Sequence, residues 1–338
     1  MRKITIQDIC AEAQVSPAAV SRVINNKPGV HHVKRERILS VINQLGFTPN
    51  AAARGLRKNT TETIGVIVPT FESLVFAGFL TGAEEVIFHH NYYMFALTTQ
   101  AANLSMKANV EKCLQLVDEK RVDGIILLDN IRDLRDQYGW RKYSIPIVSV
   151  YQHRKGMHSV VVDDFSGAYE ATKHLIDHGY RDIATLTGPN ICHDARERLR
   201  GYEAALRDHN MPYEPKNVVQ GSFTRSRSLK AFLHAYRTRT WPEAVFAAND
   251  EMAMALIQFM RSQSDPKIRS TAIIGFDDVE WAEAEGLTSV RVDVHEIGRS
   301  AARMLFEQIA HGRNQHVCHE FVRPQLMVRN TCGCPAPR

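Results

Sequence analysis

The sequence predicts a small all-α unit at the amino terminus, joined to a two-lobed α/β domain built on parallel sheets. Helical periodicity dominates residues 1–46, strands and helices alternate from residue 61 onward in two sets, and positive charge gathers at the amino-terminal end. A chain of 338 residues is also long for a single core, so more than one domain is expected. We expect domains at 1–46, 47–60 (a linker) and 61–338.

The charge distribution separates the amino-terminal end from the rest of the chain. Hydrophobic residues make up 44% and charged residues 23% of the sequence, as in ordinary globular proteins. Residues 1–60 hold ten Lys and Arg against three Asp and Glu, a net of +7, whereas the whole chain carries +5. Positive charge at one end of an otherwise near-neutral chain indicates an anionic polymer as the partner of that end.

The sequence also argues against membrane, disulfide and cofactor chemistry. No run approaches the ~20 apolar residues of a membrane span, and the first residues lack the apolar segment of a signal peptide. Six scattered Cys indicate reduced thiols and a cytoplasmic location. The Cys332-Gly-Cys334 pair could be a metal or redox pair, but we see no further ligands for it in the sequence. We therefore predict no membrane partner, no metal and no cofactor.

Three short helices are expected in the first unit. Thr5 and Asp8 have capping-box spacing at the start of a helix over about 6–13. Ser16 and Pro17 begin a second helix, as N-cap and first helical residue. A third runs over roughly 33–45 and ends at Gly46. Two short helices with a tight connection followed by a third describe a helix-turn-helix.

The second helix would present one face to the major groove of DNA. With Val20 and Val23 buried, the remaining face carries Pro17, Ala18, Ser21, Arg22 and Asn25. Arg22 is the residue there that could hold a guanine bidentately, although a surface salt bridge is the alternative role for a lone arginine. Pro17 and Ala18 offer apolar surface suited to thymine methyl groups.

A family resemblance follows from these motifs. Val15-Ser-Pro-Ala-Ala-Val-Ser-Arg-Val-Ile-Asn25 and Leu45-Gly-Phe-Thr-Pro-Asn50 resemble the DNA-binding headpiece of the LacI/GalR family of bacterial repressors. The resemblance implies that Ala18 and Arg22 read bases and that backbone contacts come from Thr5, Ser21, Asn25 and Asn50. Ala19 and Lys34 depart from the family pattern, and Lys34 would contact phosphate in place of a hydroxyl. The expected DNA-binding residues are Thr5, Ser16, Pro17, Ala18, Ser21, Arg22, Asn25, Lys34, Asn50, Ala53, Arg54 and Leu56.

The linker Asn50-Ala-Ala-Ala-Arg-Gly-Leu-Arg-Lys-Asn59 contains Leu56 as its one large apolar residue. A run this short is marginal as a helix in water, and Gly55 weakens it further. In the resembling family this segment is a hinge helix whose leucine wedges into the minor groove. The resemblance therefore implies that Leu56 inserts between base pairs and that Ala53 and Arg54 lie against DNA.

Two sets of buried strands follow. The first set is expected at 63–69, 93–98, 123–128 and 145–151, and the second at 159–163, 182–187, 244–248 and 271–276. Strand–helix alternation favours parallel sheets, and ligands bind beyond the carboxyl ends of such strands. We expect lobe one at about 61–158 and 293–322, and lobe two at about 159–292 and 323–332.

This part of the chain resembles the effector domain of the same family, which is similar to periplasmic sugar-binding proteins of type I. The motifs are Val160-Val-Val-Asp-Asp164, Arg196-Glu-Arg-Leu-Arg-Gly-Tyr202, Val245-Phe-Ala-Ala-Asn-Asp250, Ile274-Gly-Phe-Asp-Asp278 and Leu287-Thr-Ser-Val290. The resemblance places Val75 and Phe76 on a loop at the pocket mouth and Phe223 as a stacking aromatic. The expected effector-binding residues are Val75, Phe76, Asp163, Arg198, Phe223, Asn249 and Asp277.

The sequence as a whole predicts a DNA-binding repressor that reads a palindromic operator as a homodimer. Its effector would be a sugar, a sugar phosphate or a similar polar metabolite. The alternative is a cytosolic small-molecule sensor that acts through a protein partner. No phosphate-binding loop, nucleophile elbow or zinc-protease motif is present, so an enzyme is not expected. The carboxy-terminal residues carry no leucine heptad, which favours a dimer over a tetramer.

Overall fold

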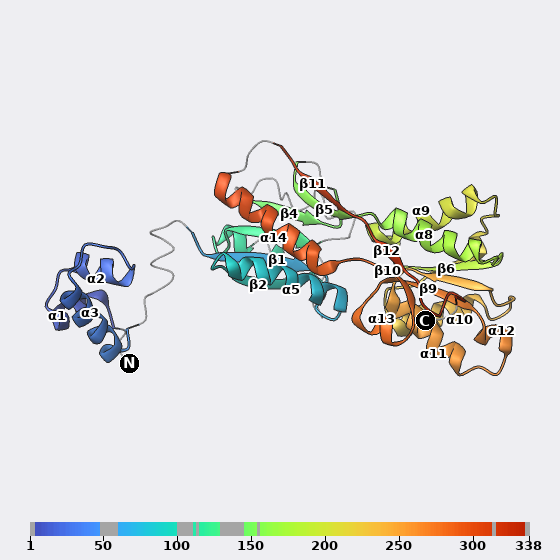
Figure 1. The fold of residues 1–338 in the computed structure, drawn as a ribbon, viewed down its shortest axis with the longest axis horizontal. Coiled ribbons are helices and arrows are strands. Elements are labelled where there is room, and N and C mark those ends of the chain that lie inside the picture. Colours follow the sequence, from blue (N-terminus) through green and yellow to red (C-terminus); the bar gives the residue numbers. More distant parts are fainter. Residues whose placement is uncertain are drawn as a thin grey trace. The chain divides into compact units, whose positions relative to one another are not determined.

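The structure, a computed structural model, describes residues 4–47, 60–99, 111–112, 115–128, 145–153, 156–312 and 316–334. The chain divides into two compact units, Met1–Thr61 and Glu62–Arg338. Figure 1 shows the helices of the first unit and the two sheets of the second. Among the described residues, no helix combines the length and the apolar character needed to cross a membrane.

The first unit is a three-helix bundle with helices α1 (Ile6–Ala13), α2 (Pro17–Ile24) and α3 (His32–Leu45). Its helix ends follow the sequence. Thr5 and Asp8 form a capping box on α1, Ser16 accepts a hydrogen bond from the backbone of Ala19 at the start of α2, and Gly46 ends α3 with φ +62°. The three helices share one small core of buried side chains, namely Ile9, Ala13, Val20, Val23, Ile38 and Val41.

Lobe one is built on a six-stranded, wholly parallel sheet with the order β11-β5-β4-β3-β1-β2. Helices α5 and α14 cover one face, where Phe79 and Leu305 join the core with strand residues such as Val66. The strands are β1 (Thr63–Val68), β2 (Tyr93–Thr98), β3 (Gly124–Leu128), β4 (Ile147–Val150), β5 (His158–Val162) and β11 (His319–Val322), and the helices are α5 (Leu74–His89) and α14 (Val294–His311).

Lobe two has a second six-stranded sheet with the order β12-β10-β9-β8-β6-β7, parallel except for β12 against β10. Helices α8 and α9 lie on one face and α10 and α11 on the other (Figure 1). The strands are β6 (Ile183–Thr187), β7 (Val218–Gln220), β8 (Ala244–Ala247), β9 (Ala272–Asp277), β10 (Thr288–Arg291) and β12 (Gln325–Met327). The helical elements are α8 (Asp164–Asp177), α9 (His193–Asp208), η2 (Pro215–Asn217), α10 (Arg225–Ala235), α11 (Asp250–Arg261), α12 (Pro266–Arg269) and α13 (Glu280–Ala284).

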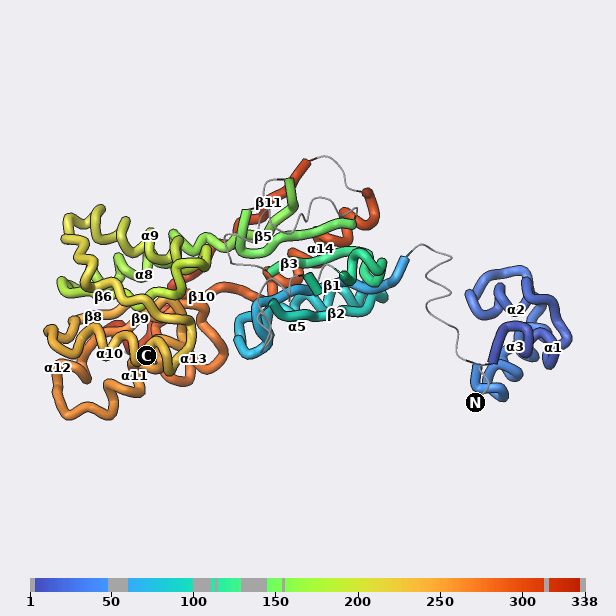
Figure 2. Tube along the Cα trace, turned by 180° about the vertical axis from the view of Figure 1, so that it is seen from behind, coloured from blue at the N-terminus to red at the C-terminus, as the bar shows by residue number. Residues whose placement is uncertain are grey.

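The chain passes between the lobes after β5, between β10 and α14, and between β11 and β12, as the tube in Figure 2 shows. The expectation that lobe two begins at residue 159 was wrong, because β5 pairs with β4 and β11 in the sheet of lobe one. The valines of β5 are buried on both faces, and such an apolar run looks the same in the sequence whichever sheet it joins. Only its pairing with neighbouring strands decides the lobe to which β5 belongs. The short strands β7, β10, β11 and β12 were not predicted.

Helices α5 and α14 pack with their backbones in close approach at two glycines. A Cβ added to Gly82 would lie 2.1 Å from the carbonyl oxygen of His295, and one added to Gly298 would lie 2.2 Å from that of Phe79. Neither obstacle is a flexible side chain, so any larger residue must push the two helices apart.

We expect Gly298→Ala to destabilise the second unit, although alanine is intrinsically the better helix former by about 1 kcal/mol. Overpacking of this kind costs about 1–3 kcal/mol, which outweighs the gain in propensity. Urea unfolding measures the change, with the exposed Glu307→Ala on the same helix as the control. A more stable Gly298→Ala protein would contradict the close approach of α5 and α14.

Candidate functional site

Helix α2 exposes the face that the sequence predicted. Pro17, Ala18 and Arg22 are exposed, Ser21 is half-buried, and Val20 and Val23 on the opposite side belong to the core. Arg22 forms no ion pair with another residue in the described part of the first unit, so the salt bridge considered for it is not found there. The guanidinium is therefore available to an external partner.

Several polar groups beside this face are engaged within the headpiece. The Thr5 hydroxyl donates to the Asp8 carboxylate at 2.7 Å, and the Asn25 amide nitrogen donates to the Ser21 carbonyl oxygen at 2.6 Å. Ser16 serves as a helix cap through its side-chain oxygen. Thr5, Ser16 and Asn25 are exposed, so each can contact a ligand only in addition to, or in exchange for, its internal bond.

The start of α3 differs from a capped helix. Its N-cap residue, His31, makes no side-chain capping bond, and Lys34 in the first turn is exposed. Arg35, which was not predicted to have a role, donates to Asn26 at 3.0 Å and to the Lys27 carbonyl oxygen at 2.9 Å. Arg35 thereby holds the segment that follows α2 against α3. The predicted residues Asn50, Ala53, Arg54 and Leu56 lie outside the described residues.

A second constellation lies at the carboxyl ends of the parallel strands in the second unit. Arg198 of α9 is buried and donates from Nε to Asp164 Oδ1 at 2.8 Å and from Nη1 to the Ala248 carbonyl oxygen at 2.5 Å. Its Nη1 also lies 3.3 Å from Asp277 Oδ1, and its guanidinium stacks 3.7 Å from the ring centre of Phe276. The predicted pair Arg198 and Asp277 is thus brought together by the fold.

Burial shapes the titration of these groups. Burial raises the pKa of Asp277 to about 7 and that of Asp164 to about 6, in both cases against the lowering effect of Arg198. Tyr151, which follows β4 of lobe one, has a raised pKa because of burial and of the nearby Asp277 and Asp164. Residues from both lobes therefore meet in one electrostatic cluster.

The expected loop position of Val75 and Phe76 was wrong, whereas the effector-binding roles of Asp163, Val75 and Phe76 stay predictions. The Asp163 carboxylate accepts a hydrogen bond from the Ser166 backbone at 3.0 Å and caps α8, so its neighbour Asp164 is the residue that meets Arg198. Because the two aspartates are adjacent, the sequence does not show which of them caps the helix and which pairs with the arginine. Val75 and Phe76 belong to the first turn of α5 and not to a loop, and Phe76 packs against the core.

Phe223 and Asn249 lie together near the ends of β6, β7 and β8. Phe223 adopts φ +61°, and its ring covers Gly188 so closely that a Cβ there would lie 2.1 Å from Cζ. Asn249 donates from Nδ2 to the Phe223 carbonyl oxygen at 3.2 Å and accepts from the Met252 backbone at 3.0 Å. The amide of Asn249 therefore fixes the aromatic residue and caps α11 at once.

Two aspartates that the sequence analysis did not select hold the segment after β9. Buried Asp250 accepts from the Val279 backbone at 2.9 Å and from the Ser289 hydroxyl at 2.5 Å. Asp278 is paired with Arg329 at 2.6 Å and with Arg291 at 2.7 Å. These bonds stabilise a backbone with positive φ at Asp277 (+104°) and Asp278 (+53°), a conformation that such residues seldom adopt.

The raised pKa of Asp277 predicts a pH dependence of stability. A carboxyl group that binds its proton more tightly when folded contributes stability below its unfolded pKa, and this contribution is lost as pH rises towards about 7. The melting temperature of the wild type should therefore fall between about pH 5, which lies above the usual Asp pKa of ~3.9, and about pH 8, which lies above the raised pKa of Asp277. We expect Asp277→Asn to reduce this fall. The exposed Glu283→Gln is the control, and an unchanged slope in Asp277→Asn would contradict the prediction.

Comparisons with known proteins agree with both sites, the exposed face of α2 and the buried cluster around Arg198. Residues 5–50 match the family described as bacterial regulatory proteins, lacI family, and residues 172–332 match a periplasmic binding protein-like domain. The repressor PurR of Haemophilus influenzae (strain PittEE) is 31% identical, over 97% of this chain and 98% of that protein.

Solved structures show the same architecture. The regulator CelR in complex with cellobiose is 28% identical, with a TM-score of 0.69 over 97% of this chain and 100% of that one. A lac repressor bound to ONPG shares the fold with a TM-score of 0.85 at 21% identity, over 98% of this chain and 100% of that one. The chain belongs to the lacI family of bacterial regulatory proteins and is a DNA-binding transcriptional repressor with an effector domain.

Proposed function

We propose that the protein binds a palindromic operator sequence-specifically as a homodimer in the cytoplasm, and that a small neutral polar metabolite controls this binding. The observation that carries the DNA part is the exposed face of α2, with Arg22 available for an external partner. The observation that carries the effector part is the buried cluster of Arg198, Asp164 and Asp277 at the strand ends.

Helix α2 has the composition of a recognition helix. Arginine is the commonest reader of guanine in the major groove because its two nitrogens match O6 and N7. Ala18 and Pro17, both exposed one turn earlier, provide apolar contacts for thymine methyl groups. Exposed Lys34 at the start of α3 supplies a phosphate contact, and Thr5, Ser16, Ser21 and Asn25 position the headpiece on the backbone.

The linker supports the same proposal through its sequence. Leu56 is an apolar residue among basic ones, which is the composition that a minor-groove wedge requires. Asn50 and Arg54 would contact the backbone, and Ala53 would allow two linkers to approach closely.

We expect Arg22→Ala to weaken binding to an operator selected from random DNA by about 1–3 kcal/mol, with little change on unselected DNA. Lys34→Ala should weaken both kinds of binding alike and lower the dependence of log K on log salt by about one. Fluorescence anisotropy at several salt concentrations measures both effects. Equal losses on selected and unselected DNA for Arg22→Ala would remove its role in base reading, and absence of DNA binding in the wild type would favour a sensor that acts through a protein partner.

An apolar surface at the edge of lobe one supports self-association. Among the strands that the structure describes, β2 lies at the edge of its sheet, and it exposes Tyr93 (75%) and Phe95 (44%). Phe88, near the end of α5, is 78% exposed. Unpaired edges with large apolar side chains are usually covered. A second copy of the chain is the occupant that also provides the two headpieces needed for a palindrome.

The charge at the effector cluster favours a neutral ligand. Arg198 is already paired with Asp164 and Asp277, and Asp194 adds a third carboxyl group to the electrostatics of the cluster. An anionic ligand such as a sugar phosphate would face carboxyl groups without a further buried cation among the described residues. The Oδ2 atom of Asp164 is buried and has no hydrogen-bond partner within the described part of the chain, so a ligand hydroxyl or N–H can satisfy it.

Sugars and purine bases both meet this description. Phe223 provides an aromatic face, and Asn249 and Asp277 provide groups that can bind hydroxyl or ring N–H groups. The relatives named PurR suggest a purine, whereas CelR is seen with cellobiose.

We expect a neutral sugar or purine base to raise the melting temperature, whereas the corresponding sugar phosphate or nucleotide should not at equal concentration. A ligand at a hundred times its Kd stabilises the folded state by about 2.7 kcal/mol. A thermal-shift screen with matched pairs, such as glucose with glucose 6-phosphate and hypoxanthine with its nucleotide, measures this difference. Asp277→Asn should diminish the shift and Glu283→Gln should leave it unchanged. A shift from the phosphorylated members alone would overturn the neutral class.

A further inference from the structure

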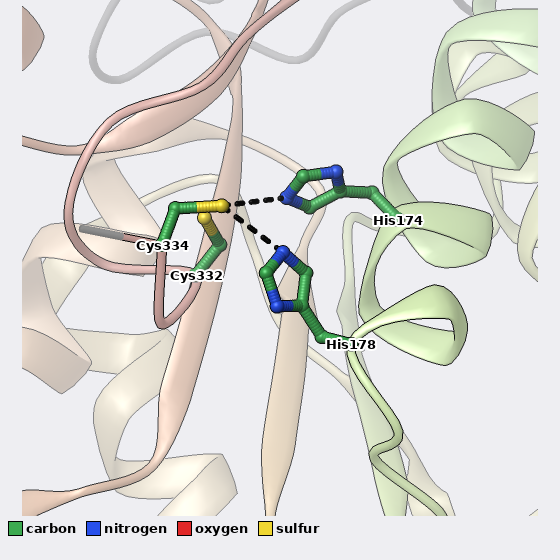
Figure 3. Close-up of side chains that lie close together, drawn as sticks. All are labelled: His174, His178, Cys332 and Cys334. Carbon is green, nitrogen blue, oxygen red and sulfur yellow. Dashed lines mark hydrogen bonds between the residues drawn. The ribbon is translucent and has the colours of Figure 1, made fainter. Parts of the chain in front are cut away.

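Four side chains with metal-binding atoms gather where the carboxy-terminal segment meets the end of α8. They are His174, His178, Cys332 and Cys334, and one ligand atom from each lies within 4.8 Å of the others. Figure 3 shows both imidazole rings directed at the two sulfur atoms. Cys334 Sγ lies 3.0 Å from His178 Nε2 and 3.7 Å from His174 Nε2. The sequence shows no further ligands beside the two thiols, but the fold brings two imidazoles to them.

We propose that His174, His178, Cys332 and Cys334 form a structural Zn²⁺ site that fastens the carboxy-terminal segment to α8. Two thiolates and two imidazoles are a set that structural zinc sites use, and S2N2 ligand sets of this kind hold zinc or iron–sulfur centres in tetrahedral geometry. With Zn–S near 2.3 Å and Zn–N near 2.0–2.1 Å, neighbouring ligand atoms in a tetrahedron are separated by about 3.3–3.8 Å. The Cys334–His174 distance of 3.7 Å lies within this range, and the Cys334–His178 distance of 3.0 Å is about 0.3 Å shorter than its lower limit, so small side-chain rotations would bring the four atoms to the separations of a loaded site.

The two histidines are placed by helix geometry. His174 lies in the last turn of α8 and His178 is its C-cap residue, so the spacing of four residues puts both rings on one face. Their ring centres are 4.6 Å apart in an edge-to-face arrangement. The same spacing holds two zinc-binding imidazoles in helical metalloprotease motifs.

The turn that carries the two cysteines is fixed independently of any metal. Thr331 donates from its hydroxyl to the Ile273 carbonyl oxygen at 2.7 Å and accepts from the Thr288 backbone at 2.9 Å. Gly333 between the cysteines has φ +91°, and a Cβ there would lie 2.4 Å from the Tyr180 hydroxyl oxygen. A residue other than glycine would be strained and crowded, so the Cys-Gly-Cys turn is held in the form that directs both sulfurs at α8.

The site would stabilise a segment that also supports the effector cluster. Arg329, three residues before Cys332, holds Asp278 at 2.6 Å, and Asp278 adjoins Asp277. At the other end of α8, Asp164 contacts Arg198. Zinc binding therefore fixes the carboxyl end of α8 and the segment that follows β12, and both elements also contribute residues to the effector cluster. This role of zinc does not depend on the proposed effector.

The test uses the full chain without an affinity tag, purified under reducing conditions and depleted of metal with a chelator. We expect one equivalent of Zn²⁺ to bind and to raise the melting temperature. Co²⁺ should give the thiolate charge-transfer and visible bands of a tetrahedral sulfur site. Cys334→Ser and His178→Ala change partly or fully exposed ligands and should leave the fold intact. Because changes in outer-shell partners alone lower metal affinity by about 10–100-fold, loss of a ligand should lower it by at least about 100-fold.

Matched controls separate the site from other thiols and imidazoles. Cys318→Ser replaces an exposed cysteine outside the cluster, and His209→Ala replaces the C-cap histidine of α9 as His178→Ala does for α8. Both controls should bind Zn²⁺ as the wild type does. The proposal is overturned if the reduced wild type binds no zinc or gives no thiolate band with Co²⁺. It is equally overturned if Cys334→Ser keeps full affinity, or if Cys332 and Cys334 form a disulfide that persists in the presence of zinc under mild reduction.

Discussion

The effector domain depends on one buried cation. Arg198 is almost wholly removed from solvent, with a side chain that is 4% exposed, and Asp164 is 1% exposed. A buried charge is tolerated only when it is paired and hydrogen-bonded. Arg198 meets this need by contacting Asp164 at the start of α8, Ala248 after β8 and Asp277 at the end of β9. Three strand-end segments are therefore placed by a single guanidinium, and losing either carboxylate leaves this buried charge with one partner fewer.

Part of the backbone strain in the described residues lies beside this cluster. Tyr151, Phe223, Asp277 and Asp278 all adopt positive φ without being glycine, and they surround or adjoin the cluster. Such conformations persist only where neighbouring contacts determine them. Asp250 and the pair of Asp278 with Arg329 supply these contacts from a helix start and from the carboxy-terminal segment. The same segment carries Cys332 and Cys334 to α8, so the far end of the chain contributes to the order of the effector cluster.

The first unit is built on a different principle. Its core is small, and the helix ends are fixed by local capping at Thr5, Ser16 and Gly46. Local caps and a few buried side chains suffice because the bundle must only hold α2 with one face uncovered. The exposed Arg22 face is available for DNA, whereas the buried Arg198 is committed to internal pairing.

The sequence by itself determined what depends on local spacing. Patterns within a few residues predicted the caps of α1 and α2, the end of α3 and the principal strands, and motif resemblance selected Arg198 and Asp277 as effector-binding residues. Only the tertiary structure decided which of Asp163 and Asp164 faces the arginine, which sheet receives β5, and that Val75 and Phe76 are helical. It alone brought His174 and His178 to cysteines that lie more than 150 residues away, at separations of 160 and 156 residues from Cys334. Short-range periodicity carries no information about contacts between distant segments, because these are set by the pairing of strands and the packing of helices on them.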